Sequence, residues 1–189
     1  MSSALDLASE LRARGALVEG HFKLSSGRHS HQFVQKFRLL EDPKLVELVA
    51  YEIADAFRSA QPTVVVSAAV GGIILGYEVA RSLSTRAIFV EKENGIPVLR
   101  RGFELGPKDR ALVVEDVVTT GLSVREVLNV VRARNAELVG VGIIVQREPT
   151  YFGVRTHSLL ELPLESFAQH ECPQCARGEP ITDPGSRRA

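Results

Sequence analysis

Residues 112–123, with the sequence LVVEDVVTTGLS, constrain the fold of this chain more than any other segment. Three apolar residues, of the kind found in buried strands, lead into two adjacent carboxylates, Glu115 and Asp116. A short turn with two threonines and Gly121 follows, and apolar residues at helical spacing come after it. Such a strand–turn–helix unit is typical of an open α/β sheet, in which ligands bind in the crevice beyond the carboxyl ends of the strands.

The same alternation of strand and helix runs through the chain. We therefore expect an α/β fold, with a central, mostly parallel sheet flanked by helices, in a single domain of residues 1–189. Residues 1 to about 40 are left over to cover part of it, and residues 170–189, rich in Pro, Gly and charge, are expected to form a loosely held tail. Apolar runs predict strands at 64–66, 87–90, 111–114 and 138–145, and helical spacing predicts helices within 1–20, around 45–53, ending near 83, and at 123–134.

Composition excludes several classes of function. The 23 basic residues balance 23 acidic ones, so no overall field draws the protein to nucleic acid, and anionic substrates must meet local clusters. The N-terminal residues lack the apolar core of a secretory signal. The longest apolar stretch, 64–77, is short and interrupted by glycines, which argues against a membrane span. We expect a cytoplasmic protein with neither nucleic acid nor membrane as a partner.

The turn after the acidic pair has the chemistry of an anion site. Free amides at a helix start bind phosphate, and a glycine there lets the phosphate approach the backbone. Ser123 and Glu126 have capping-box spacing, which predicts the start of the helix at this point. Two carboxylates would repel a phosphate, but they accept hydrogen bonds from sugar hydroxyls. The segment therefore suits a ribose 5-phosphate; the alternative is an ordinary turn with a solvated acidic pair.

This segment resembles the binding motif for phosphoribosyl pyrophosphate (PRPP) of type I phosphoribosyltransferases. The resemblance implies that the acidic pair contacts the ribose hydroxyls, with Asp116 in a catalytic role, and that the loop holds the 5-phosphate. It also implies Mg²⁺ as a cofactor, held mainly by PRPP and not by a protein metal site. The implied PRPP-binding residues here are Glu115, Asp116, Val117, Val118, Thr119, Thr120, Gly121, Leu122 and Ser123.

Two further segments point to orotate as the base. Residues 20–30, GHFKLSSGRHS, resemble the N-terminal signature of orotate phosphoribosyltransferases, which folds over the base as a hood. Arg147 follows the strand 138–145, and its guanidinium can bind a carboxylate such as that of orotate through two hydrogen bonds. By resemblance, Arg147 and Thr119 contact orotate. The alternatives are a plain Ser-Gly turn, a surface arginine, and a purine or uracil as the base.

Residues 91–102 form a polar, glycine-bearing connection that resembles the start of the mobile catalytic loop of the family. The resemblance implies that Lys92 is catalytic and reaches the pyrophosphate, with Arg100 and Arg101 nearby, and that the loop crosses to the neighbouring site of a homodimer. The alternative is a solvated loop. The chain has only 5 lysines, which makes each one informative.

The chain also departs from the family pattern. Gly71 and Gly72 follow the second strand, where many members carry a lysine; their amides could still bind pyrophosphate. Ser25 stands where many members have Lys or Arg. These losses leave open a regulatory protein that binds PRPP without catalysis.

The tail contains a Cys-x-x-Cys step at Cys172 and Cys175. Two cysteines supply half of a structural zinc site, which usually has four ligands. His170 is a candidate third ligand. An unliganded turn is the favoured interpretation over a structural metal.

Overall fold

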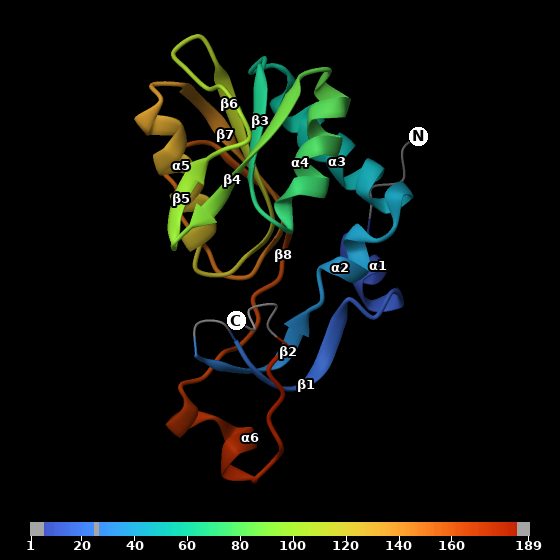
Figure 1. Ribbon diagram of the computed structural model, residues 1–189. Helices are drawn as coiled ribbons and strands as arrows, with labels where there is room; N and C mark the ends of the chain where they lie inside the picture. Colours follow the sequence, from blue (N-terminus) through green and yellow to red (C-terminus); the bar gives the residue numbers. More distant parts are fainter. Residues whose placement is uncertain (1–5, 25–26, 185–189) are drawn as a thin grey trace.

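The computed structural model describes residues 6–24 and 27–184. Within them, six strands form a central sheet in the order β5-β4-β3-β6-β7-β8 (Figure 1). Neighbouring strands are parallel except β4 and β5, which are antiparallel, so the predicted fold class is confirmed. The strands are β3 Val64–Ala68, β4 Arg86–Glu93, β5 Ile96–Leu99, β6 Arg110–Val118, β7 Glu137–Gln146 and β8 Thr156–Glu161.

Side-chain alternation along β3 determines which helices cover each face of the sheet. Val65 belongs to the cluster with α3 (Pro43–Arg58) and α4 (Gly72–Leu83), whereas Val64 and Val66 belong to the cluster with α5 (Leu122–Ala133). Because both faces are buried, the strands read as continuous apolar runs. Among the described helices, none combines enough length with enough apolar character to cross a membrane.

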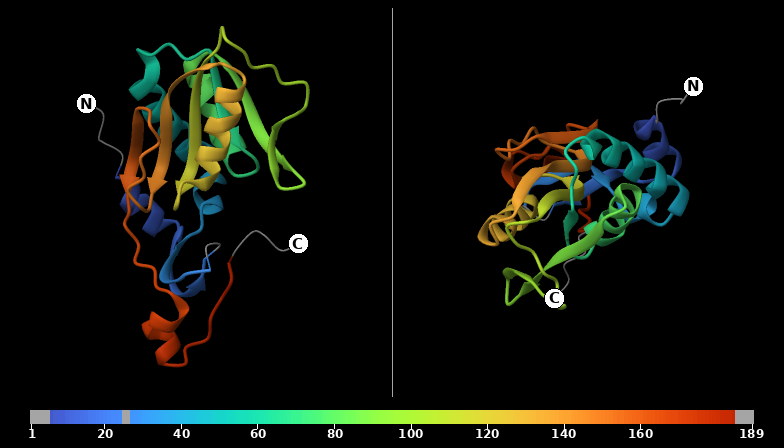
Figure 2. Two further views of the ribbon diagram at one scale, coloured as in Figure 1. Left: turned by 90° about the vertical axis from the view of Figure 1, so that its left-hand side faces the viewer. Right: turned by 90° about the horizontal axis from the view of Figure 1, so that it is seen from above.

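The N-terminal residues 6–40, here called the hood, form a separate small sheet and two short helices. The strands β1 and β2 pair antiparallel, so the region expected to be one helix within residues 1–20 becomes a strand from Leu17 onward. The arrowheads of the parallel strands point toward the hood (Figure 2, left). Ser25 and the adjoining Ser26 lie outside the described residues. The hood elements are α1 Leu7–Ala13, β1 Leu17–Lys23, β2 His29–Val34 and α2 Phe37–Leu40.

The C-terminal tail packs on the hood, so the expectation of a loosely held tail is wrong for residues 170–184. The backbone of Thr182 accepts a hydrogen bond from the Lys23 amide at 2.9 Å and donates one to the His21 carbonyl at 2.8 Å. Thr182 thereby forms a parallel bridge with Phe22, and Phe167 forms an antiparallel bridge with His29. A 3-10 helix at Gln169–Glu171 and α6 at Pro173–Ala176 lie between these contacts. Main-chain pairing with β1 therefore holds a segment whose composition suggests disorder.

The connection 91–102 also differs from the expected flexible loop. It forms a β-hairpin in which Lys92 lies opposite Pro97, with Asn94 and Gly95 in the turn at φ 51° and 81°. Asn-Gly is the preferred pair for such a turn, so the hairpin could have been predicted from the sequence. Strand β8 was missed because all of its residues are partly or fully exposed, which leaves no clear apolar pattern.

Candidate active site

The acidic pair lies within β6, not beyond its end. The sequence predicted a strand that stops at residue 114, but β6 continues to Val118 because Glu115 pairs with Ile143 and Val117 with Val145 of β7. Both acids are consequently buried, with Glu115 6% and Asp116 2% exposed. A solvated acidic pair, the alternative considered from the sequence, is wrong.

Burial makes the pair electrostatically unusual. Desolvation, followed by the negative charge of Asp116, raises the pKa of Glu115 to about 8, while Lys36 acts in the opposite direction. The Asp116 carboxylate accepts a hydrogen bond from the Val117 amide at 2.6 Å and lies 2.9 Å from the Lys36 ammonium group. Asp116 therefore has an ionic partner at the carboxyl edge of the sheet, and burial beside it favours the protonated form of Glu115.

Lys36 is a site residue that sequence reasoning missed. It comes from the hood, 80 residues before Asp116, and its Nζ donates to Asp116 Oδ1 at 3.1 Å. It also fills the space beside Gly71, where an added Cβ would lie 2.4 Å from Lys36 Nζ and 2.3 Å from Asp116 Oδ2. The turn at Gly71 and Gly72, where many family members carry a lysine, thus has the ammonium group of Lys36 beside it. Only the scarcity of lysine in the sequence could have drawn attention to Lys36.

The turn before α4 approaches the acidic pair. Gly71 and Gly72 are both buried, and Gly71 precedes the first residue of α4. A Cβ on Gly72 would lie 3.6 Å from Glu115 Oε1. The Ala69–Val70 peptide that leads into the turn is cis. Residues 71–72 and the acids therefore lie side by side, and Lys36, which contacts Asp116, connects them to the cavity described below.

The phosphate loop, residues 119–123, leaves the start of α5 uncapped. Gly121 precedes the helix with a left-handed φ of 77°, and no side chain caps the helix. A Cβ there would also lie 2.8 Å from Phe152. The predicted capping box is wrong, since Ser123 is the second helical residue and Glu126 pairs with Lys92 at 2.7 Å. Among the described residues, no side chain accepts a hydrogen bond from the first amides of α5. These amides, together with the Ser123 hydroxyl, can therefore bind an anion.

A cavity of about 1040 Å³ lies between the phosphate loop and the hood. This is the size of a site for a nucleotide-like ligand. Its walls come from the end of β6 and the phosphate loop, from the hood, from the end of β7, and from the tail. The lining residues are Lys23, Leu24, Gly27, Arg28, Phe33, Gln35, Lys36, Phe37, Val117, Thr119, Thr120, Ser123, Arg147, Glu148, Ser166, Asp183 and Pro184.

Arg147 lies in this cavity beside the phosphate loop. Its amide donates to the Val118 carbonyl at 2.8 Å, which aligns the end of β7 with the end of β6. The residue is only 6% exposed, and burial lowers the pKa of its guanidinium. Its buried Nε has no hydrogen-bond acceptor among the described residues. A buried guanidinium with an unused donor favours an anionic ligand, and an exposed surface arginine, the alternative, is wrong.

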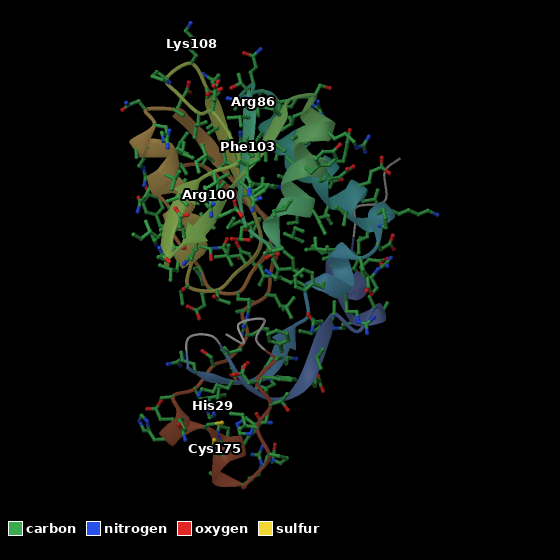
Figure 3. The ribbon with its side chains drawn as sticks, in the orientation of Figure 1. His29, Arg86, Arg100, Phe103, Lys108 and Cys175 are labelled. Carbon is green, nitrogen blue, oxygen red and sulfur yellow. The ribbon has the colours of Figure 1, made fainter. Side chains whose placement is uncertain are left out.

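The structure does not bring Lys92 into the same cavity. Its side chain is 41% exposed on the β4–β5 hairpin and pairs with Glu126. Arg101 pairs with Glu91 at 2.8 Å, and Arg100 lies on the same hairpin (Figure 3). The cationic residues expected around the pyrophosphate therefore form ion pairs within one chain, Lys92 with Glu126 of α5 and Arg100 and Arg101 with Glu93 and Glu91 of the hairpin.

Comparison with known proteins agrees with this geometry. Residues 38–159 match the family model described as a phosphoribosyl transferase domain. The chain is 44% identical over 185 residues to the orotate phosphoribosyltransferase of Pelotomaculum thermopropionicum, covering 97% of both chains. It is 48% identical over 179 residues to the orotate phosphoribosyltransferase of Thermotoga petrophila, covering 94% of this chain and 96% of the relative. The chain belongs to the orotate phosphoribosyltransferase family.

Solved structures place the fold in the same family. The crystal structure of orotate phosphoribosyltransferase from Aeropyrum pernix superposes with a TM-score of 0.70 at 29% identity, over 82% of this chain and 93% of that chain. The central sheet described above is therefore the fold of a type I phosphoribosyltransferase.

Proposed function

We propose that this chain transfers the 5-phosphoribosyl group of PRPP to orotate, giving orotidine 5′-phosphate and pyrophosphate in pyrimidine biosynthesis. The observation that carries the proposal is one cavity that joins an uncapped helix start to a buried arginine with an unused donor. The first suits a sugar phosphate and the second suits a carboxylate-bearing base. Two relatives named orotate phosphoribosyltransferase match more than 90% of the chain.

The phosphate loop would hold the 5-phosphate of PRPP. Its donors are the first amides of α5 and the hydroxyls of Thr119, Thr120 and Ser123, and Gly121 allows close approach. Glu115 and Asp116, at the end of β6, would accept hydrogen bonds from the ribose hydroxyls. As pyrophosphate leaves, the ribose ring gains oxocarbenium character, and the carboxylate of Asp116 stabilises that positive charge. Of the aliphatic members of the set, Val118 is buried, Val117 lines the cavity and Leu122 is 58% exposed, so only their backbone would contact PRPP.

The pyrophosphate would lie beside the turn at Gly71 and Gly72. Their backbone offers amides, and the ammonium group of Lys36 supplies the positive charge that the turn lacks. The oxygen-rich surroundings of the acidic pair suit Mg²⁺, which prefers oxygen ligands and would arrive with PRPP to neutralise the leaving group. Lys36 is thus proposed as a PRPP-binding residue in addition to those predicted from the sequence.

Orotate would bind between Arg147, Thr119 and the hood. The guanidinium of Arg147 offers its free Nε and its terminal nitrogens to the orotate carboxylate. The hood covers the base from the opposite side through Lys23, Leu24 and Phe33, which line the cavity. This arrangement would orient the ring nitrogen of orotate toward the anomeric carbon of the PRPP ribose. The ring nitrogen can ionise, so the chain needs no general base.

Lys92 requires a second subunit to act in catalysis. Its hairpin lies away from the cavity of its own chain, so we propose a homodimer in which the hairpin serves the neighbouring site. Mixing Lys92→Ala subunits with Asp116→Asn subunits should then restore part of the activity. No recovery in confirmed mixed dimers would rule out the shared site without affecting the choice of substrate. The cytoplasmic location stays a prediction.

The test of the function is a direct assay. Protein, Mg²⁺, PRPP and orotate are mixed, and the ultraviolet absorbance of orotate is followed, with uracil and hypoxanthine in parallel. We expect orotate alone to be consumed, and Arg147→Ala to reduce kcat/KM for orotate by about 100-fold or more. Consumption of uracil or hypoxanthine, or full activity in Arg147→Ala, would overturn the assignment of the base.

A further inference from the structure

Four metal-binding side chains converge at the far end of the hood from the central sheet. His21 lies in β1, His29 in β2, and Cys172 and Cys175 at the start of α6. Their nearest nitrogen and sulfur atoms all lie within 4.8 Å of one another. His29 and Cys175 face each other between the small sheet and α6 (Figure 3). Three segments from opposite ends of the chain thus meet at one point.

Four of the six distances between the ligand atoms are close to the edges of a tetrahedron around one metal ion, and all six are within 4.8 Å. Zinc bonds of about 2.0–2.1 Å to nitrogen and 2.3 Å to sulfur imply edges of about 3.3 Å between two nitrogens and 3.5 Å between nitrogen and sulfur. His21 Nε2 lies 3.3 Å from His29 Nδ1 and 3.4 Å from Cys172 Sγ. Cys175 Sγ lies 3.7 Å from His21 Nε2 and 3.2 Å from His29 Nδ1. The spacing therefore leaves a place for an ion at the centre.

The surroundings prepare the ligands for a metal. His21 Nδ1 lies 3.0 Å from the Glu179 carbonyl, to which it can only donate, and this leaves the lone pair of Nε2 directed at the cluster. His21, His29 and Cys172 are buried, at 6%, 3% and 3% exposure. A backbone carbonyl that orients a ligating histidine is a common feature of zinc sites.

We propose that His21, His29, Cys172 and Cys175 bind one Zn²⁺ in a closed, four-ligand structural site. Two sulfurs and two nitrogens in tetrahedral arrangement suit zinc, whereas Mg²⁺ requires oxygen ligands. The proposal replaces the unliganded turn favoured from the sequence. It also corrects the candidate third ligand, because the His170 side chain is 81% exposed and lies against Glu171, outside the cluster.

The site joins the parts of the chain that cover the cavity. The turn between its two histidines includes Gly27 and Arg28, and residues just after its cysteines include Asp183; all three line the cavity. Arg28 Nε also donates to Ser166 Oγ at 2.8 Å, which ties this turn to the segment that leads into the tail. Zinc would therefore hold the hood and tail in position over the substrate cavity. This consequence rests on the proposed function, whereas the metal site itself does not.

The first experiment measures metal in the full-length protein purified without added chelator. Elemental analysis should find about one zinc per chain in the wild type and in the control His170→Ala. His29→Asn and Cys175→Ser should each retain less than about one fifth of it. Zinc-free protein refilled with Co²⁺ should show the visible absorption bands of a tetrahedral, thiolate-bound ion, a readout that does not depend on folding of any variant.

Two outcomes of these measurements would overturn the proposal. The first is wild-type protein that contains no zinc and takes up no Zn²⁺ or Co²⁺ after reduction. The second is a disulfide between Cys172 and Cys175 in protein purified under reducing conditions. If zinc binds, its removal should lower Tm by about 5 °C or more and raise KM for orotate more than it lowers kcat. A metal-replete protein without transferase activity would refute the proposed function and leave the zinc site intact.

Discussion

Glu115→Gln should abolish part of the pH dependence of folding stability. Burial raises the pKa of Glu115 to about 8 from its ordinary value of 4.5, so the folded protein keeps this proton where the unfolded chain has lost it. Between these two pH values the folded state binds more protons, and the free energy of unfolding must fall as pH rises. Below pH 4.5 the contribution is fully present, and above pH 8 it is lost. Glutamine keeps the shape of the protonated side chain but cannot ionise.

The structure sets the size of the effect. One pH unit of difference in proton affinity is worth about 1.4 kcal/mol, so a pKa moved from 4.5 to about 8 gives a ceiling of roughly 4–5 kcal/mol. The neighbouring Lys36 is 31% exposed and connects the acidic pair to the cavity, where water screens the charge. We therefore expect Glu115→Gln to be more stable than the wild type by about 1–3 kcal/mol at pH 9 and nearly equal to it at pH 5.

Urea unfolding of the ligand-free protein between pH 5 and 9, at one protomer concentration, measures this difference. Glu52→Gln is the matched control, because Glu52 is exposed on α3 and its replacement should not change the pH dependence. If the difference in unfolding free energy between the wild type and Glu115→Gln were constant across this range, the raised pKa would be refuted. An equal effect in Glu52→Gln would show that the change reflects overall charge.

Two further predictions concern residues around the same site. Lys36→Met keeps the aliphatic stem but removes the cation, so KM for PRPP should rise about 10- to 100-fold in steady-state assays, whereas the exposed control Lys44→Met should leave it unchanged. An unaltered KM would exclude Lys36 from the PRPP site. Gly121→Ala should lower the free energy of unfolding by about 1–3 kcal/mol, because alanine must adopt φ 77° with its Cβ 2.8 Å from Phe152. Gly106→Ala, which has open space around it, is the control, and equal stability of the two variants would contradict the steric argument.

Local signals made the central fold and the phosphate loop predictable. The β-branched run at 64–66 predicts a buried strand, and the spacing of Val124, Val127, Leu128 and Val131 predicts a helix with one buried side. The parallel order of β3, β6 and β7 then places residues at their carboxyl ends along one edge. This is why the sequence alone predicts that Thr119 and Arg147, 28 positions apart, lie at one site.

Other features could not be predicted because their determinants are distant in the sequence. Periodicity shows that a residue is buried but not which partner it meets, so it could not show that Lys36 reaches Asp116 across 80 positions. The tail reads as disordered because the β1 backbone that pairs with it lies at the other end of the chain.

The cysteines give the clearest case. By sequence Cys172 and Cys175 are half of a metal site, because His21 is 151 positions from Cys172 and His29 is 146 from Cys175. Each histidine lies in a strand, and nothing in its neighbouring residues indicates a metal ligand. The sequence by itself determined the order of β3, β4, β6 and β7, the helices that follow β3 and β6, and the loop chemistry, since these depend on neighbouring residues. Tertiary structure decided which distant side chains share a charge or a ligand position, because closure of long loops brings them within a few ångströms.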